Sequence, residues 1–485
     1  MKKQSKTPLF DTLLAHAKRD VVSFHTPGHK NGRGIDAKLK NYTGENVYGF
    51  DVTVFDEVDS LHDPRGPIKK AQELMAEAYG VEHSLFLVNG TSGGNIAMFL
   101  SACNPGDSVI VSRSSHKSIL AGIILAGLWP IWIQPEIDQN LDIIFNSTYN
   151  QVAEALNNYP EAKAVFITSP TYNGVTTQLK KIAALCRKKG KILLVDEAHG
   201  PHLKFHPEFP ESAIEAGADM CVQSTHKILS ALSQGSVLHV NSKLVDINRV
   251  KKVVSMTQTT SPNYLTLASL DLARHQAVTS GKEMFDKVIE AAEWARETIN
   301  KEIPSMKCLT RAQVNKLGFD LDLTKLTVNV TKTGLSGYEI EAILAKEYNI
   351  QLDYADLFNL IAIMGIGSDM SDVKALVAAL KEISKKYKGK QKNWKLQIPS
   401  LSTEMVMMPR NVVFSPNTKS IPLAKAVGHV SAQTLTPYPP GIPVLIPGER
   451  ITKEICDYLT EMSAKGIRIS GQESDALKTI KVFAN

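Results

Sequence analysis

The feature that most constrains the fold is a regular alternation of short apolar runs and helical segments between residues 85 and 240. Strands that alternate with helices form a mostly parallel sheet with helices on both faces, so the predicted fold class is α/β. The apolar runs predict strands at 85–88, 108–111, 131–133, 164–168, 192–195, 220–222 and 235–240, and the segments between them predict helices at 94–102, 117–126, 151–156 and 179–188.

The rest of the chain divides around this region. We predict that residues 1–66 form an N-terminal segment with active-site loops. Within it, residues 21–66 are rich in Gly, Pro, His and Asp with little periodicity, which is typical of a functional segment or of one that wraps a partner. We predict a large domain at 67–280, a smaller α+β domain at 281–386, a linker at 387–395 and a C-terminal α+β domain at 396–485. The smaller domain is predicted from helices at 282–300, 338–347 and 371–386 and strands at 326–330 and 360–364.

Composition narrows the classes of function. The 55 basic and 49 acidic side chains are spread along 485 residues, so no basic patch predicts a nucleic-acid partner. Five scattered cysteines suit neither a disulfide framework nor a CxxC metal site, and they favour a reducing compartment. The uncharged stretch 118–133 is shorter than the ~20 residues that span a bilayer. The basic start lacks the apolar core of a secretion signal, so we expect a cytoplasmic protein without a membrane partner.

Two residues at neighbouring strand ends indicate a cofactor. Asp196 follows the predicted strand 192–195, and Lys227 comes shortly after the strand 220–222. The carboxyl ends of neighbouring parallel strands open onto one crevice. Pyridoxal phosphate needs a lysine that holds it as a Schiff base and a carboxylate that keeps its ring nitrogen protonated. Asp196 and Lys227 supply this pair, although a helix-capping Asp and a solvated Lys are the common alternatives.

The turn NGTSGGN at 89–95 lies between a strand and a helix. Small residues there expose backbone N–H groups that bind phosphate, and Thr91 and Ser92 add hydroxyls; a simple helix cap is the alternative. The turn also fits the G-x-S-x-G elbow of a serine hydrolase, with Ser92, Asp196 and His199 in hydrolase order. Because Asp196 and His199 are three residues apart, whereas a triad usually takes its acid and base from separate loops, this second function is disfavoured.

Histidines suggest two further roles. His116 follows a strand end, where its imidazole could lie flat against a cofactor ring or simply cap a helix. Prolines break any helix that would align the later histidines, and their order is not H-E-x-x-H, so we predict no metal. The side chains considered for a metal were His199, His202, His206, Asp196 and Glu197.

Taken together, these motifs resemble the bacterial-type ornithine/lysine/arginine decarboxylases, which are pyridoxal-phosphate enzymes of the aspartate-aminotransferase fold (fold type I). The chain looks most like the short arginine decarboxylases. The matching stretches keep the family's order over nearly the whole chain: HTPGHKNG, LHDPRGPI, NGTSGGN, RSSHKS, DEAHGPH, STHK, TTSPNYLTLASLD and PYPPGIPVLIPGE.

The resemblance implies roles for individual residues. Lys227 would hold the cofactor, Asp196 would pair with the pyridine nitrogen, His116 would stack on the ring, and His199 would lie near the ring oxygen. The phosphate would be held by Thr91, Ser92, Ser224 and His226, and by Thr259 from a second subunit, which implies a homodimer or larger homo-oligomer with the site at the interface. Family members usually read R-N-x-H-K-S where this chain has Arg113, Ser114 and Ser115.

The resemblance also implies decarboxylation of a basic amino acid, with arginine preferred over lysine or ornithine. A buried cationic side chain needs a carboxylate partner. Glu449 is the candidate that the family suggests, and Asp356 and Asp353 are weaker ones. The alternatives are pairing of Glu449 with Arg450 and helix capping by Asp356. Transamination is disfavoured because no arginine for the α-carboxylate appears between residues 320 and 386.

Overall fold

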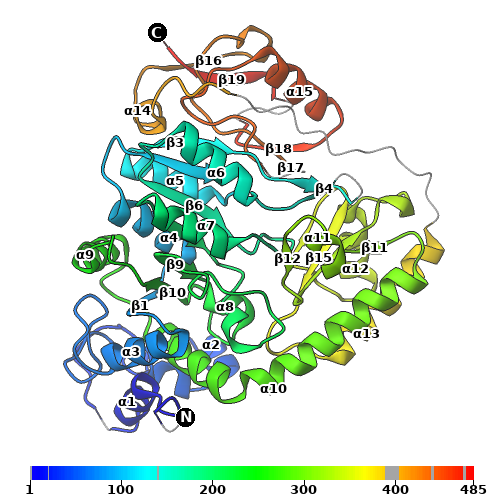
Figure 1. Cartoon of the computed structure of the whole chain (residues 1–485). Helices are drawn as coiled ribbons and strands as arrows, with labels where there is room; N and C mark the ends of the chain where they lie inside the picture. The colour runs from blue at the N-terminus through cyan, green and yellow to red at the C-terminus, as the bar shows by residue number, and fades with distance from the viewer. Residues whose placement is uncertain are drawn as a thin grey trace.

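A seven-stranded sheet forms the centre of the molecule (Figure 1). The structure, a computed structural model, describes residues 3–19, 21–138, 141–387, 403–438, 442–472 and 477–484. Of the seven strands of this sheet, β10 alone runs in the direction opposite to the other six, which matches the predicted α/β class. The strands in spatial order are β1 (His83–Leu87), β10 (Ser236–Val240), β9 (Met220–Gln223), β8 (Ile192–Asp196), β6 (Ala164–Thr168), β2 (Ser108–Ser112) and β3 (Trp129–Ile133).

Helices cover both faces of this sheet, because its inner strands are apolar on both sides. In β8 every residue is buried, with alternate side chains packing into two different cores. Burying one such Leu or Val contributes about 1.5–3 kcal/mol. One face is covered by α4 (Gly90–Ala102), α5 (Lys117–Ala126) and α9 (Ile247–Thr257), and the other by α6 (Tyr149–Asn158) and α7 (Leu179–Lys188).

A long helix, α10 (Tyr264–Glu302), joins the large domain to the small one (Figure 1). The predicted helix 282–300 is therefore too short at its start, because the buried pattern continues back through Ala277, Ala273 and Leu270 and Asn263 caps the helix. The predicted boundary at residue 281 falls inside α10, and the domain limits stay a prediction. The small domain contains an antiparallel sheet of β11 (Lys307–Cys308), β13 (Lys325–Asn329), β15 (Asn359–Ile363) and β14 (Tyr354–Ala355), with α12 (Gly337–Glu347) and α13 (Met370–Lys386).

The C-terminal region has a core of its own and lies against the edge of the central sheet near β3 and α5 (Figure 1). Arg410 of α14 (Pro409–Val413) donates to the carbonyl of Leu125 in α5 at 2.9 Å, which fixes this contact. Residues 388–395 of the predicted linker lie outside the described residues. The other elements of this region are β16 (Thr418–Pro422), β17 (Thr436–Tyr438), α15 (Lys453–Ala464), β18 (Arg468–Ser470) and β19 (Thr479–Phe483).

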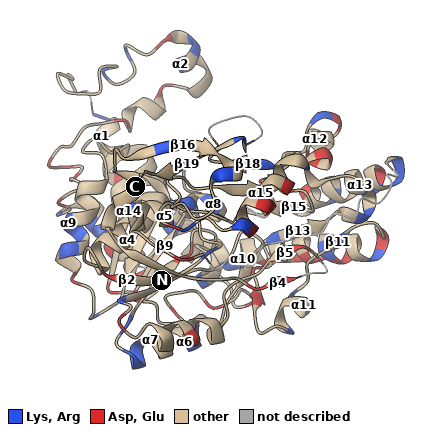
Figure 2. Ribbon diagram, turned by 90° about the horizontal axis from the view of Figure 1, so that it is seen from above, with Lys and Arg blue, Asp and Glu red and all other residues tan. Residues whose placement is uncertain are grey.

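The N-terminal segment contains α1 (Pro8–Ala17), which packs into the core with α3 (Pro67–Tyr79), and α2 (Ala37–Thr43), which has no buried residue. Figure 2 shows α2 at the end of an arm that projects from the rest of the molecule. Phe24 and Tyr42 on this arm are 93% and 92% exposed. Both aromatic side chains are therefore left uncovered by the rest of this chain.

Candidate active site

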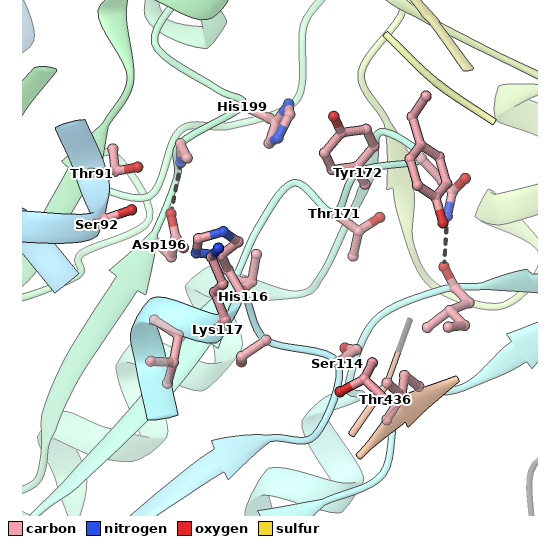
Figure 3. Close-up of a pocket in the computed structure, with 18 of the residues that line it drawn as sticks. Thr91, Ser92, Ser114, His116, Lys117, Thr171, Tyr172, Asp196, His199 and Thr436 are labelled. Atoms are coloured by element: carbon pink, nitrogen blue, oxygen red, sulfur yellow. Dashed lines mark hydrogen bonds between the residues drawn. The ribbon is translucent and has the colours of Figure 1, made fainter. Parts of the chain in front are cut away.

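A cavity of about 880 Å³ lies at the carboxyl ends of the central strands. Three parts of the chain line it: the large domain, the segment around β14 and β15 of the small domain, and the region around β17. Figure 3 shows Thr91 and Ser92 at one end, Tyr172 and Thr436 at the other, and His116 and Asp196 between them. The cavity therefore has two chemically different ends.

Asp196 ends β8 and is 2% exposed. Its carboxylate accepts hydrogen bonds from the side-chain amide of Asn95 at 2.9 Å and from the backbone N–H of Ala198 at 3.0 Å. These two donors fix the carboxylate at the pocket wall while leaving further acceptor positions on its oxygens. Asp196 is thus held as a buried acceptor for a positively charged group.

Lys227 lies on α8 (Thr225–Ile228), directly after β9, the neighbour of β8 in the sheet. Its Nζ is 2.8 Å from Nε2 of His199. Burial lowers the pKa of Lys227 below its ordinary value, and Asp196 and Asp353 oppose this shift. Burial also holds the pKa of His199 well below its ordinary value. A lysine amine that loses its proton readily is a nucleophile towards a carbonyl group.

His116 is the N-cap of α5, and its Nδ1 accepts from the backbone N–H of Ser118 at 3.3 Å. The Ser118 hydroxyl accepts from Asn95 at 3.0 Å, and Asn95 also donates to Asp196. His116 and Asp196 are therefore linked through two residues that the sequence analysis missed. Burial, which outweighs the opposing effect of Asp196, lowers the pKa of His116, so a neutral ring faces the cavity.

The turn before α4 and the turn before α8 meet at the same end of the cavity, where the Thr91 and Ser224 hydroxyls lie 3.1 Å apart. Thr91 is in the first turn of α4, whose free N–H groups and dipole suit a phosphate. His226 is oriented by the carbonyl of Gly235 at 2.9 Å. A side chain at Gly94 would overlap Val222 of β9, so glycine lets the helix approach the sheet this closely.

These residues fit the cofactor that the sequence predicts. They place a carboxylate, an amine, an imidazole and a cluster of hydroxyls around one cavity, which is the donor set that pyridoxal phosphate needs. Four buried atoms of pocket-lining residues have no hydrogen-bond partner among the described residues: the Ser115 and Thr168 hydroxyls, Nε1 of Trp132 and Nδ1 of His199. Buried polar atoms usually have partners, so such atoms mark a place where a ligand can bind.

The serine-hydrolase alternative is wrong for this geometry. His199 pairs with Lys227, and Asp196 binds Asn95 and Ala198, so neither residue forms the acid–base pair that would activate Ser92. The later histidines have separate partners: His202 is 3.0 Å from Asp322, and His206 is 2.8 Å from Asp286.

Two kinds of feature are absent from the parts of the chain that the structure describes. In those ranges, no group of three or more His, Cys, Asp or Glu side chains has the geometry of a metal site. No described helix combines the length and the apolar character needed to cross a membrane.

The far end of the cavity is lined by Tyr172, Tyr354, Tyr438 and Asp356. One oxygen of Asp356 accepts from the backbone N–H groups of Phe358 and Asn359, both at 2.7 Å. Burial raises the pKa of Asp356 to about 6, although those hydrogen bonds lower it. Asp353, the other weak candidate, is exposed and accepts a hydrogen bond from the Tyr172 hydroxyl.

Glu449 does not line the cavity of its own chain, and its predicted contact with the substrate side chain stays a prediction. It is 0% exposed and forms an ion pair with Arg113, which is 1% exposed. Its carboxylate also accepts from the Thr403 hydroxyl at 2.6 Å and the Ile446 N–H at 2.9 Å. The partner is thus Arg113, 336 residues away, and not the adjacent Arg450, which binds Glu404.

Thr259 lies outside the cavity of its own chain, exposed at the end of α9. Its carbonyl accepts from His62 at 2.8 Å, and its hydroxyl accepts from the N–H of Ser261 at 3.1 Å. Its predicted contact with the phosphate in a second subunit stays a prediction.

Comparison with known proteins agrees with this geometry. Residues 7–372 match the family described as "Orn/Lys/Arg decarboxylase, major domain", and residues 394–476 match its C-terminal domain. The arginine decarboxylase of Halalkalibacterium halodurans is 40% identical over 100% of this chain and 99% of its own length. That of Bacillus subtilis is 39% identical over 99% of this chain and 98% of its own. The constitutive lysine decarboxylase of Escherichia coli is 25% identical over 96% and 79%.

Solved structures show the same fold. The lysine decarboxylase of Francisella novicida superposes with a TM-score of 0.85 at 24% identity, over 98% of this chain and 81% of that one. An alanine–glyoxylate aminotransferase from Nostoc superposes with a TM-score of 0.52 at 16% identity, over 68% and 89%. The predicted fold is therefore confirmed, and the full-length matches show that the chain belongs to the Orn/Lys/Arg decarboxylase family.

Proposed function

We propose that this chain decarboxylates L-arginine to agmatine and CO₂ with pyridoxal phosphate as cofactor, and so supplies a precursor of polyamines. The observation that carries the proposal is that Asp196, at the end of β8, and Lys227, just after the adjacent strand β9, line the same cavity. Arginine is preferred because the full-length relatives at 38–40% identity are named arginine decarboxylases.

Each residue at the cofactor end has a task in this reaction. When bound, the cofactor provides a protonated pyridine ring that withdraws electrons from the substrate α-carbon. Asp196 keeps the ring nitrogen protonated, and His116 supports one face of the ring. Lys227 is the attachment point of the cofactor. Nζ of Lys227 and Nε2 of His199, 2.8 Å apart, are the groups placed to return a proton to the α-carbon.

The far end of the cavity would bind the substrate's cationic head. Asp356 is held by two backbone N–H groups on one oxygen, and aromatic side chains of Tyr354 and Tyr438 lie in the same wall. A planar guanidinium pairs well with a carboxylate and stacks well on aromatic rings. This wall therefore suits arginine, and the cation would also favour the charged form of Asp356.

We also propose that the active unit is a homodimer or larger homo-oligomer that works in the cytoplasm. The projecting α2 arm exposes Phe24 and Tyr42, which a second copy would cover (Figure 2). Thr259 is exposed and free to reach another chain's phosphate site. All five cysteines are free and buried, which suits a reducing compartment. Sedimentation of the purified protein tests the assembly.

The decisive experiment supplies the purified protein with pyridoxal phosphate and offers arginine, lysine and ornithine in separate reactions. CO₂ release and the amine product are measured, together with the visible absorbance of the bound cofactor. We expect agmatine to form much faster than cadaverine or putrescine. Faster release from lysine would overturn the substrate assignment, and glutamate formation from 2-oxoglutarate would favour transamination.

A further inference from the structure

Three buried ionisable side chains meet behind the active site, where the large domain contacts the small one. They are His202, from the turn that follows β8, Asp322, from the segment that joins β12 (Asp320–Leu321) to β13, and Lys325, the first residue of β13. All three are 0% exposed. Here β12 pairs with β7 (Val175–Thr176) of the large domain, so the cluster lies at the junction of the two domains.

The contacts of Lys325 use all three of its N–H donors. Its Nζ donates to Asp322 at 2.8 Å, to the Thr324 hydroxyl at 3.1 Å and to the backbone carbonyl of His199 at 3.4 Å. The other oxygen of Asp322 accepts from Thr324 and pairs with His202 at 3.0 Å. The cluster is therefore an ordered network, and Lys325 connects it to His199, the residue that contacts Lys227.

Stability alone does not account for such a network. Burying a charged pair removes both ions from water, and apolar side chains of similar volume are often as stabilising or more so. Apolar side chains cannot donate to the His199 carbonyl, and they carry no charge. Those two properties are what the Asp322–Lys325 pair adds at this position.

The same cluster supports the other neighbour of His199. The N–H of Asp322 donates to the carbonyl of Gly174 at 2.8 Å. A side chain at Gly174 would come within 2.8 Å of Lys325, and its φ of +85° also favours glycine. This turn carries Tyr172, whose ring meets the His199 imidazole edge-on at 4.7 Å between centroids. The cluster thus fixes His199 from its backbone and through the ring beside it.

We propose that Lys325, held by Asp322, is a positioning residue of the active site: it fixes the turn that carries His199 and places a positive charge behind Lys227. The inference rests on the role proposed above for Lys227. Within that role, it names a residue outside the cavity that prepares the amine for reaction.

The positive charge of Lys325 lowers the pKa of Lys227. Asp196 and Asp353 face Lys227 and raise its pKa, whereas burial and the charge of Lys325 lower it; His199 and His116 also lie beside it. Without the Lys325 charge, less remains to oppose the effect of Asp196 and Asp353, which raises the pKa of Lys227. The amine of Lys227 then holds its proton to higher pH and is less reactive near neutrality.

The test uses Lys325→Met, which keeps most of the volume, and measures the cofactor-free protein first. Trace acetic anhydride labels lysines in proportion to their unprotonated fraction, and peptide mass spectrometry reads Lys227 as a function of pH. We expect the Lys227 midpoint to rise by about one pH unit. Lys381→Met is the matched control, because Lys381 pairs with Glu302 elsewhere in the small domain, and it should leave the midpoint unchanged.

The second measurement is turnover of the loaded enzyme. Lys325→Met should lower kcat about tenfold or more with KM within about twofold, since displacement of His199 affects the reacting atoms and not the far end of the cavity. If Lys325→Met does not fold, Lys325→Met with Asp322→Asn removes both charges and should keep the kcat loss with a smaller midpoint shift. Folded variants with an unchanged midpoint and unchanged kcat would overturn the proposal. The labelling result does not need decarboxylation, so it separates this inference from the proposed activity.

Discussion

The two ends of the cavity are built in different ways. At the cofactor end, Asp196, Lys227 and Thr91 come from strand ends and turns of a single, mostly parallel sheet, and hydrogen bonds join their neighbours. The far end is assembled from the large domain, the small domain and the C-terminal region. The central sheet can hold the same cofactor-binding residues in place, whereas the far end, built from three parts of the chain, can change its lining residues without disturbing the cofactor end.

The largest effect is expected at the cofactor end. Lys227→Ala removes the attachment point and one of the two groups placed to move a proton, so CO₂ release should fall by about 10²–10⁴-fold or more. Borohydride should fix the cofactor to the wild-type protein and not to the variant, which peptide mapping can show. Lys381→Met, remote from the cavity, should retain activity and serves as the control. Full turnover by Lys227→Ala would contradict the proposed function.

A smaller and different effect is expected at the far end. Asp356→Asn keeps the size of the side chain and its bonds to Phe358 and Asn359 but removes the negative charge. A hydrogen bond to a charged group contributes about 1.5–3 kcal/mol, so KM for arginine should rise roughly tenfold or more. The variant should still bind the cofactor normally, as its visible absorbance will show. A change in cofactor binding with unaltered KM would contradict the division between the two ends.

The pH dependence of kcat/KM tests the role of Asp356 at the far end in a second way. Because burial raises the pKa of Asp356 to about 6, the carboxyl is neutral below that pH and cannot pair with a cation. The value of kcat/KM for arginine, which reports groups of the free enzyme, should therefore fall as the pH drops through about 6. Asp356→Asn should lack this acidic limb. If kcat/KM fell in the same way at low pH in the wild type and in Asp356→Asn, the fall would belong to the titration of another group.

The contrast also explains what the sequence could predict. Asp196, Lys227 and His116 each follow a strand within a strongly periodic region, so their convergence follows from the order of the elements. Asn95 and Ser118, which connect them, lie on helices where an ordinary polar residue gives no signal. The sequence analysis assigned no role to Asp322 and Lys325, because their contacts with His202 and His199 form only where the two domains meet. The start of α10 was missed because Gly281 resembles a helix break, yet its neighbours stay buried.

Glu449 lies outside the cavity of its own chain and pairs with Arg113, so its variant should have the smallest effect on substrate binding. Glu449→Gln keeps part of the hydrogen bonding between residue 449 and Arg113 but removes the negative charge that pairs with the buried guanidinium. Loss of one partner from a buried pair destabilises a protein by up to about 3–5 kcal/mol, and the near-isosteric Gln should cost less. Urea unfolding should show this loss, while KM for arginine stays within about twofold of wild type. Glu404→Gln, which breaks the exposed pair with Arg450, is the matched control and should change neither quantity measurably. A tenfold rise in KM for Glu449→Gln alone would return this residue to the substrate site, and the far end would then need the C-terminal region for recognition as well as for its wall.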